Sequence, residues 1–262
     1  MTIAKPDALD QWDDLRSRLD EAGVIVFLDY DGTLTPIVAR PDQAVLTPEM
    51  RNTLRHLANR WPTAIVTGRS LEQIEQLVNV PGITYAGSHG FDIRGPGIRY
   101  QVGAQARDAI NHAFAEIVQM IGGIEGVLVE NKTFSVAVHF RLVPPGLKQK
   151  VIEATHEVAR KHGLRVTGGK QVIEMRPDVD WDKGTAIRWL AERLPGRTPL
   201  FIGDDVTDED AFRAIRGDGI TILVSAEPRE TAAEYSLRDV EAVHEFLRRL
   251  AEIPRRDAAA QP

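Results

Sequence analysis

Cysteine is absent from the sequence, which excludes disulfide bonds, thiolate metal sites and cysteine nucleophiles. Aromatic residues make up only 6% of the chain, and no apolar run approaches the length that spans a membrane. Neither sign of charge is in large excess, since the formal net charge is −6. That mild acidity gives no indication of a nucleic-acid surface or a membrane-binding surface.

The segment from Met1 to Trp12 is polar and charged, so it does not have the pattern of a secretory signal peptide. Together with the absence of cysteine, this favours a cytoplasmic protein. With 262 residues, 43% of them hydrophobic, the chain is long enough for one large domain or two smaller ones. A monomer without nucleic-acid or membrane partners is expected.

The most informative stretch is the apolar run Val24–Leu28, which leads directly into Asp29 and Asp31 and then into Gly32. A continuous apolar run rich in β-branched residues predicts a strand that is covered on both faces, as in a parallel sheet. Ligands of open α/β sheets bind beyond the carboxyl ends of the strands. Two neighbouring carboxylates there repel each other, which favours a hard cation as their companion. The alternative is a strand followed by an ordinary acidic turn.

Strand and helix patterns alternate on both sides of this run. Helices are expected over 8–21, from 48 onward and over 71–78, and strands over 63–66 and 83–86. The alternation resumes with a helix over 182–194, a strand over 200–202, a helix over 211–215, a strand over 220–224 and a helix over 240–253. This is typical of an α/β fold with a doubly wound parallel sheet.

The alternation is interrupted from about Arg99 by a segment with a different pattern. Helices are expected over 104–121 and 145–161, and strands over 126–130, 134–141, 164–167 and 171–176. This order predicts an inserted α+β domain with an open-faced sheet. The expected division is a core of 1–103 and 178–253, an insert of 104–177, and a disordered tail of 254–262.

Four features fall at predicted strand ends or at a helix start, and their chemistries complement one another. They are Asp29 with Asp31, Thr67 with Gly68, Lys183, and the acidic run of Asp204, Asp205 and Asp208. Carboxylates can attack phosphorus and transfer protons, a threonine at a helix start and a lysine can hold phosphoryl oxygens, and an acidic cluster can bind Mg²⁺. Each feature alone could be an ordinary turn, loop or solvated lysine. Their occurrence together favours a site.

In this order the four motifs resemble those of the haloacid dehalogenase-type phosphohydrolases. Further segments, among them Gly87-Ser88-His89-Gly90 and Glu130-Asn131-Lys132, resemble the trehalose-6-phosphate phosphatases over about residues 20 to 250. The resemblance implies a core with an inserted cap and hydrolysis of trehalose 6-phosphate through an aspartyl phosphate. The chain departs from the usual pattern at Thr67, where many relatives have serine, and at Asp182, where relatives often have asparagine.

The resemblance also assigns roles. Asp29 is implied to be the nucleophile and Asp31 the general acid and base, with Thr67 and Lys183 holding the phosphoryl oxygens. Mg²⁺ is implied to be bound by Asp29, the Asp31 backbone carbonyl and Asp204, with Asp205 and Asp208 orienting its ligands. The expected substrate-binding residues are Asp29, Asp31, Gly68, Arg69, Ser88, His89, Gly90, Glu130, Lys132, His139, Arg141, Lys170, Glu174 and Arg176.

The charged residues of the insert have a second interpretation as the solvated face of an amphipathic sheet. The two-residue period of a strand predicts that Glu174 and Arg176 share one face, as do His139 with Arg141, and Glu130 with Lys132 if the strand continues beyond 130.

The function also has alternatives. They are another sugar-phosphate phosphatase, a phosphohexomutase of the same superfamily, and a non-catalytic domain that binds sugar phosphate. A mutase returns phosphate to the sugar, so an assay for inorganic phosphate separates it from a phosphatase. A dehalogenase fits less well, because its chemistry needs no metal.

Overall fold

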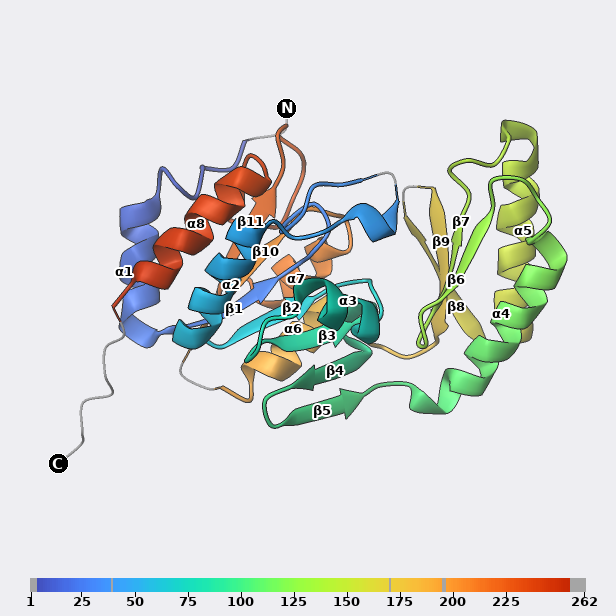
Figure 1. Ribbon diagram of the computed structural model, residues 1–262, viewed down its shortest axis with the longest axis horizontal. Coiled ribbons are helices and arrows are strands. Elements are labelled where there is room, and N and C mark those ends of the chain that lie inside the picture. Colours follow the sequence, from blue (N-terminus) through green and yellow to red (C-terminus); the bar gives the residue numbers. More distant parts are fainter. Residues whose placement is uncertain (1–3, 39, 170, 195–196, 255–262) are drawn as a thin grey trace. The chain divides into compact units, whose positions relative to one another are not determined.

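The computed structural model describes residues 4–38, 40–169, 171–194 and 197–254 (Figure 1). Lys170 and the tail from 255 onward, for which sequence analysis made predictions, lie outside the described residues. The chain divides into two compact units, which are described separately below. Unit 1 comprises Met1–Arg99 and Asp182–Pro262, and unit 2 comprises Tyr100–Trp181.

Unit 1 is built on one sheet, whose described strands run in the order β12-β11-β10-β1-β2-β3-β4-β5. The strands are β1 Val24–Leu28, β2 Thr63–Val66, β3 Thr84–Gly87, β4 Asp92–Gly95, β5 Ile98–Gln101, β10 Thr198–Gly203, β11 Ile220–Val224 and β12 Tyr235–Leu237. Neighbouring strands from β12 to β3 pair in parallel, and β4 pairs antiparallel with β3. The predicted doubly wound parallel sheet is confirmed. All five residues of β1 are buried, because β1 lies in the interior of the sheet.

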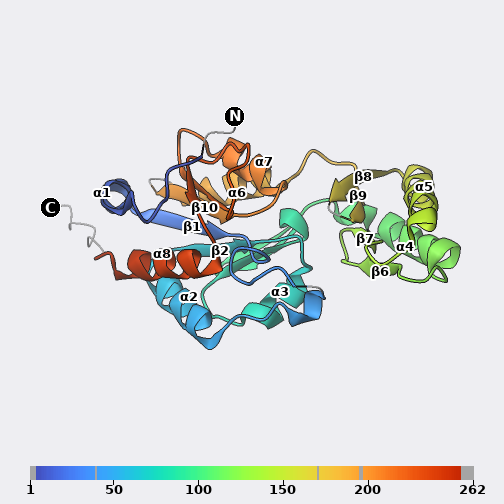
Figure 2. The ribbon, with the colours of Figure 1, turned by 90° about the horizontal axis from the view of Figure 1, so that it is seen from above.

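Helices cover both faces of this sheet. They are α1 Trp12–Ala22, α2 Pro48–Arg60, α3 Leu71–Val78, α6 Lys183–Ala191, α7 Asp208–Ala214 and α8 Val240–Glu252, with a short 3-10 turn, η1, at Pro41–Gln43. Figure 2 shows α6 and α7 on one face and α2, α3 and α8 on the other. Alternate residues of β1 point to opposite faces of the sheet. Val24, Val26 and Leu28 pack in the core beneath α2 and α8, and Ile25 and Phe27 point to the opposite face.

Two local differences from the sequence predictions have physical causes. The first helix begins at Trp12 rather than at Ala8, because Asp7 and Ala8 pair with Ser236 at the edge strand β12. The predicted third strand is followed by η2 (Ser88–Gly90) and by β4 and β5, which the sequence patterns did not indicate. These additional strands extend the sheet and belong to unit 1 as far as Arg99.

Unit 2 has a four-stranded sheet in the order β6-β7-β9-β8, with two long helices packed on one face. Its elements are β6 Leu128–Asn131, β7 Val136–His139, β8 Leu164–Gly169, β9 Val172–Pro177, α4 Arg107–Ile121 and α5 Pro145–Lys161, with a 3-10 turn, η3, at Ala104–Ala106. Their order along the chain is the one that the sequence predicted. Alternation places Val136, Val138, Ile173 and Met175 in the core beneath the helices. The opposite face of the sheet is largely polar.

The two ends of unit 2 lie side by side. The rings of Tyr100 and Trp181, its first and last residues, have centroids 5.8 Å apart. The chain therefore leaves unit 1 within β5, after Arg99, and returns to it at Asp182, just before α6. None of the helices in the described ranges is long and apolar enough to cross a lipid bilayer.

Candidate active site

The centre of the candidate site is a buried lysine that bridges two carboxylates. Lys183, the first residue of α6, donates from Nζ to Oδ1 of Asp29 at 2.8 Å and to Oδ1 of Asp208 at 2.5 Å. Asp29 directly follows β1 and Asp208 opens α7, so three elements meet here. Asp182 places the lysine, because its side chain caps α6 by accepting the N–H of Thr185 at 2.7 Å. Burial lowers the pKa of Lys183, but Asp208 and Asp29 outweigh it and the net pKa is raised.

Asp208 also organises the loop after β10. Its Oδ2 accepts the backbone N–H groups of Asp204 at 2.8 Å and Asp205 at 2.9 Å, while its Oδ1 is bound by Lys183. Both oxygens of this fully buried carboxylate are therefore engaged within the protein. Gly203 permits this arrangement, since a Cβ there would lie 2.5 Å from the Asp208 carboxylate. Asp208 thus has the contacts of an orienting residue.

The carboxylates of Asp29, Asp204 and Asp208 fit a divalent cation. One oxygen from each lies within 4.8 Å of the others. Oδ1 of Asp204 is buried and has no hydrogen-bond partner among the described residues. Three carboxylates face a single ammonium group, and this excess negative charge is the setting that oxygen-binding cations neutralise. Gly32 lies against the Asp204 carboxylate at φ +81°, where a Cβ would overlap that carboxylate.

Without a cation, the pKa values of the cluster reflect its crowding. Burial raises the pKa of Asp29 well above its ordinary value, Lys183 opposes the shift, and Asp208 and Asp204 add to it. Burial, followed by repulsion from Asp208 and Asp205, raises the pKa of Asp204 to about 7. Of the five predicted metal residues, Asp29, Asp204 and Asp208 form this cluster; the side chains of Asp31 and Asp205 are not part of it.

Asp31 is held by Arg69. The guanidinium donates from Nε to Oδ2 at 2.7 Å and from Nη2 to Oδ1 at 2.6 Å, which is a bidentate pair. Arg69 also lies over the ring of Tyr30, with its Cζ 5.2 Å from the ring centroid. Tyr30 is fixed in turn by donating from its hydroxyl to the Ala44 carbonyl at 2.7 Å. Sequence analysis named Arg69 as a substrate-binding residue but did not anticipate that it pairs with Asp31.

The loop of Thr67 and Gly68 is hydrogen-bonded to the turn η2. The N–H of Ser88 donates to the Arg69 carbonyl and that of His89 to the Thr67 carbonyl, both at 2.7 Å. The imidazole of His89 lies so close to Gly68 that a Cβ there would be 2.9 Å from it. Ser88 and His89 have φ values of 48° and 58°, a conformation that non-glycine residues rarely adopt. Such strain at consecutive residues is typical of a functional site.

The polar face of the unit 2 sheet brings together several of the predicted cap residues. Lys132 donates to Glu174 at 2.7 Å, and Nε2 of His139 lies 2.7 Å from Oε2 of Glu130. In the strand register, Glu130 and Glu174 both oppose Ala137, so their side chains share this face.

Arg176 lies on the same face, two residues beyond Glu174 on β9. Arg141 does not, and the prediction that it shares a strand face with His139 is wrong. The strand β7 ends at His139, and Arg141 is exposed in the turn that follows.

One charged residue beside the site was missed by sequence analysis. Arg229 donates from Nη2 to the Asp205 carbonyl at 3.3 Å and approaches Glu209 at 3.9 Å. Its charge partly offsets the raised pKa of Asp204. A signal was available, because Arg229 follows the apolar run 220–224, whose carboxyl end lies at the same edge of the sheet as that of β10.

The fold of this chain is one that solved haloacid dehalogenase-like hydrolases share. A solved haloacid dehalogenase-like hydrolase from Bacteroides thetaiotaomicron shares the fold, with a TM-score of 0.62 at 16% identity over 87% of this chain and 99% of that one. The chain belongs to the trehalose-phosphatase family, whose model matches residues 27–241. It is therefore a phosphoric monoester hydrolase by family.

Two relatives illustrate this membership. The chain is 41% identical to trehalose 6-phosphate phosphatase RA3 of Zea mays, over 94% of this chain and 74% of the relative. A solved trehalose-6-phosphate phosphatase related protein is similar with a TM-score of 0.79 at 30% identity, covering 87% of this chain and 96% of that one.

Proposed function

We propose that this protein hydrolyses trehalose 6-phosphate to trehalose and inorganic phosphate through an aspartyl phosphate on Asp29, with Mg²⁺ as its cofactor. The observation that supports this most strongly is the buried cluster in which Lys183 contacts Asp29 beside Asp204. Family membership supports the sugar phosphate as substrate. We further propose that the protein is a cytoplasmic monomer that acts on this small molecule without nucleic-acid or membrane partners.

Asp29 and Asp204 are the side chains proposed to hold Mg²⁺, together with the main-chain carbonyl of Asp31. The unpartnered Oδ1 of Asp204 supports its part in this set. Asp205 and Asp208 would act as orienting residues, and the two N–H groups that Asp208 accepts support that role. When bound, Mg²⁺ would offset the repulsion between the Asp29 carboxylate and the anionic phosphate.

In the first half-reaction an oxygen of Asp29 attacks the phosphorus, and the bond from phosphorus to the sugar oxygen breaks. Asp31 transfers its proton to that oxygen, so trehalose leaves as a neutral alcohol. Lys183 supplies positive charge beside the nucleophile. Thr67 and the backbone of Gly68 are proposed to hold phosphoryl oxygens, together with Lys183.

In the second half-reaction water attacks the phosphorus of the aspartyl phosphate. Asp31 accepts a proton from that water, and the bond between phosphorus and the Asp29 oxygen breaks to release inorganic phosphate. The bidentate pair with Arg69 supports Asp31 in this step, because it fixes the orientation of the carboxylate. Arg69 is a positioning residue in this scheme.

We propose that the polar face of the unit 2 sheet binds the disaccharide and so selects the substrate. Sugar hydroxyls need donors and acceptors at fixed positions, and the pairs Lys132–Glu174 and Glu130–His139 provide both in a partly buried setting. We therefore propose unit 2 as a cap that contributes substrate contacts. From unit 1, Ser88, His89 and Gly90 are proposed to add contacts beside the phosphate.

The experiment is a phosphate-release panel over trehalose 6-phosphate, glucose 6-phosphate, sucrose 6-phosphate and p-nitrophenyl phosphate. We expect the highest kcat/KM on trehalose 6-phosphate. Asp29→Asn should be folded but inactive, since an amide is a poor nucleophile of nearly the same shape.

Each alternative has its own outcome in this panel. Equal rates on all sugars would indicate a general sugar-phosphate phosphatase, and phosphate returned to the sugar would indicate a mutase. Binding without turnover would indicate a regulatory domain. Turnover by Asp29→Asn near that of the parent would exclude the aspartyl-phosphate mechanism.

A further inference from the structure

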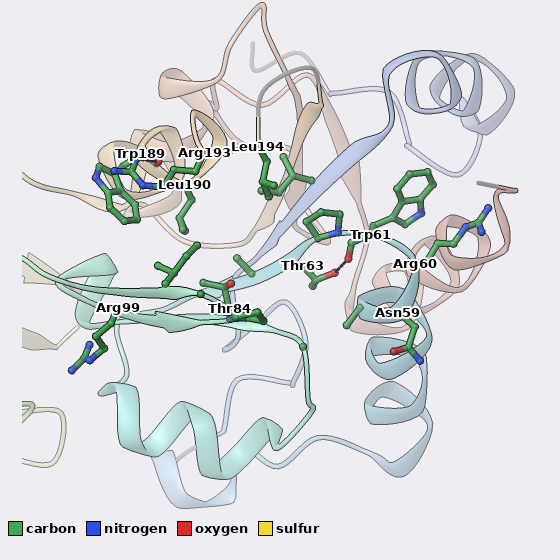
Figure 3. A pocket seen from close by; sticks show the side chains of 18 residues that line it. Asn59, Arg60, Trp61, Thr63, Thr84, Arg99, Trp189, Leu190, Arg193 and Leu194 are labelled. Atoms are coloured by element: carbon green, nitrogen blue, oxygen red, sulfur yellow. Dashed lines mark hydrogen bonds between the residues drawn. The ribbon is translucent and has the colours of Figure 1, made fainter. Parts of the chain in front are cut away.

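Unit 1 contains a cavity of about 670 Å³ that none of the steps above uses. Its walls come from the starts of β1, β2 and β3, the turn between β4 and β5, the end of α2, and the last turn of α6 with the residues after it (Figure 3). Ile25 of β1 and Ala64 of β2 form part of its floor on the α6 side of the sheet. A volume of this size is within the range of small-molecule sites.

The interior of the cavity is mainly apolar. In Figure 3, Leu190 and Leu194 project toward the sheet from one side, and Thr63 and Thr84 lie on the opposite wall. The hydroxyl of Thr63 is already engaged, since it donates to the Trp61 carbonyl at 2.9 Å. The cavity therefore combines this hydrocarbon surface with polar surface from Asn59, Thr84 and the arginines of its lining. An occupant needs an apolar body to gain binding energy from these walls.

All charged residues that line the cavity are cationic. They are Arg60, Arg99 and Arg193, and no aspartate or glutamate is present among the 18 described residues of the lining. This differs from the chain as a whole, which carries a net charge of −6. Arg99 is neutralised by Asp92, but neither Arg60 nor Arg193 has an acidic partner among the described residues. The cavity therefore favours an anion.

Arg193 is held in one conformation in which it can bind an anion. Its Cζ lies 3.3 Å from the centroid of the Trp189 ring, so the guanidinium stacks on the indole. Nη1 donates to the Trp189 carbonyl at 2.6 Å, which fixes the group and leaves its other N–H donors for a ligand. Figure 3 shows this pair at the edge of the cavity, beside Leu190. A guanidinium held in this way can donate its remaining N–H groups to the oxygens of an anionic group.

The cavity is separate from the candidate active site within unit 1. It contacts the last turn of α6 at Leu190, whereas Lys183 is the first residue of that helix. It likewise contacts Ile25 near the start of β1, whereas Asp29 follows the end of that strand. A ligand in the cavity and a phosphate at Asp29 therefore occupy opposite ends of the same two elements.

We propose that this cavity is a second ligand site, which binds a small aromatic anion with its rings between Leu190, Leu194 and the sheet and its charge at Arg193. The proposal is independent of the substrate proposed above. A suitable probe is 8-anilinonaphthalene-1-sulfonate, whose fluorescence rises in apolar surroundings and which has both parts of this chemistry.

The test is a fluorescence titration of the full chain in the presence of saturating inorganic phosphate. We expect one probe molecule to bind per chain, with a dissociation constant on the order of 10 µM. Arg193→Glu should weaken binding by about tenfold or more, because it places a like charge beside the sulfonate. Arg16→Glu is the matched control: it makes the same change of net charge at an exposed residue of α1, and binding should be unchanged. Circular dichroism confirms that each variant is folded.

Two further measurements separate this site from nonspecific adsorption. Ala58→Trp places a large ring on a lining residue of α2 and should block the probe. N-phenyl-1-naphthylamine has the same rings without the sulfonate and should bind about tenfold more weakly. The proposal is overturned if Arg193→Glu binds the probe as Arg16→Glu does, if phosphate displaces the probe, or if the uncharged analogue binds equally well.

Discussion

Arg69 binds the Asp31 carboxylate through two parallel hydrogen bonds, from Nε at 2.7 Å and from Nη2 at 2.6 Å. The two residues come from loops that follow β1 and β2, which are adjacent parallel strands. The pair is therefore set by the sheet itself. The pair holds Asp31, the proposed general acid and base, in one orientation. Substitution of Arg69 therefore measures how much that orientation contributes to turnover.

The first prediction is that Arg69 acts through Asp31. Arg69→Ala should lower kcat by about 10- to 100-fold, a part of what general acid–base catalysis contributes. Asp31→Asn should lower it further, and the double variant should be no worse than Asp31→Asn, since coupled residues are not additive. Steady-state kinetics on all three variants checks this. Fully additive losses would show that Arg69 contacts the substrate independently of Asp31.

The second prediction concerns stability. Lys183→Ala leaves the buried carboxylates of Asp29 and Asp208 without a cation, and we expect a loss of about 3 to 5 kcal/mol in the free energy of unfolding. Lys161→Ala is the control, because its pair with Glu116 is at the surface and its removal should change the free energy of unfolding far less. Urea denaturation in EDTA measures both. Similar losses in the two variants would contradict the structural role of the buried lysine.

The third prediction is that Asp204 binds the metal. EDTA should abolish turnover and Mg²⁺ should restore it. Asp204→Asn should weaken Mg²⁺ binding, measured by calorimetry, by about 10- to 100-fold, because its unpartnered oxygen is the free ligand of the cluster. Asp210→Asn, an exposed change on the same acidic segment, should leave Mg²⁺ affinity as it is. Equal affinities in both variants would remove Asp204 from the ligand set.

The fourth prediction separates sugar recognition from phosphate chemistry. Glu130→Ala, Lys132→Ala and Glu174→Ala should each lower kcat/KM for trehalose 6-phosphate by about 10- to 1000-fold. Turnover of p-nitrophenyl phosphate should stay near that of the parent, because the residues around Asp29 are untouched. Glu116→Ala removes a carboxylate from α4 of the same unit and should affect neither substrate. Equal losses on both substrates would assign these residues to folding instead.

The fifth prediction is a pH dependence of stability. Burial raises the pKa of Tyr30 to about 12, against an ordinary value of 10. The neutral phenol is thus favoured in the folded state, and its stabilising contribution is complete below pH 10 and is lost as pH rises toward 12. At pH 11 the loss should be about 1 kcal/mol.

Tyr30→Phe provides the control for this pH dependence. It removes the hydrogen bond to Ala44 and should cost about 1 kcal/mol at pH 8. The parent and the variant should then converge in urea denaturation at pH 11. A stability difference that does not change with pH would contradict the assignment.

The parts of the fold with strong periodicity were predictable from the sequence. The unbroken apolar run of β1 indicated a strand buried on both faces, which is present, and the alternation of β7 indicated an antiparallel strand, which is also present. The expectation that only one face of β7 would be packed is wrong, because Val136, Ala137 and Val138 are all buried. The hairpin strands β4 and β5 were not predicted. Arg94 and Arg99 give these strands a polar pattern. β5 lies at the sheet edge, which does not require an apolar pattern, and β4 has only two buried residues, Asp92 and Ile93.

The site was predictable in its residue types but not in its pairings. The predicted strand ends at Asp29 and Asp204, and the predicted helix start at Lys183, indicated that these three residues belong to one site. The choice of Arg69 as the partner of Asp31 depends on side-chain geometry across 38 positions of sequence, which no local pattern records. The cavity was not predictable for the same reason, since its walls come from five separate stretches of the sequence, each of which has its composition for a different local reason.

The contact between Tyr100 and Trp181 has a consequence for how the chain can fold and evolve. Because the two ends of unit 2 are in contact, the insertion joins Arg99 to Asp182 over a short distance, as a tight turn would. The entropy lost when unit 1 folds and brings Arg99 close to Asp182 is then that of closing a short loop, whatever the length of the inserted segment. Segments of another size or shape could replace unit 2 at this junction while the sheet of unit 1 and its carboxylate cluster stay as they are.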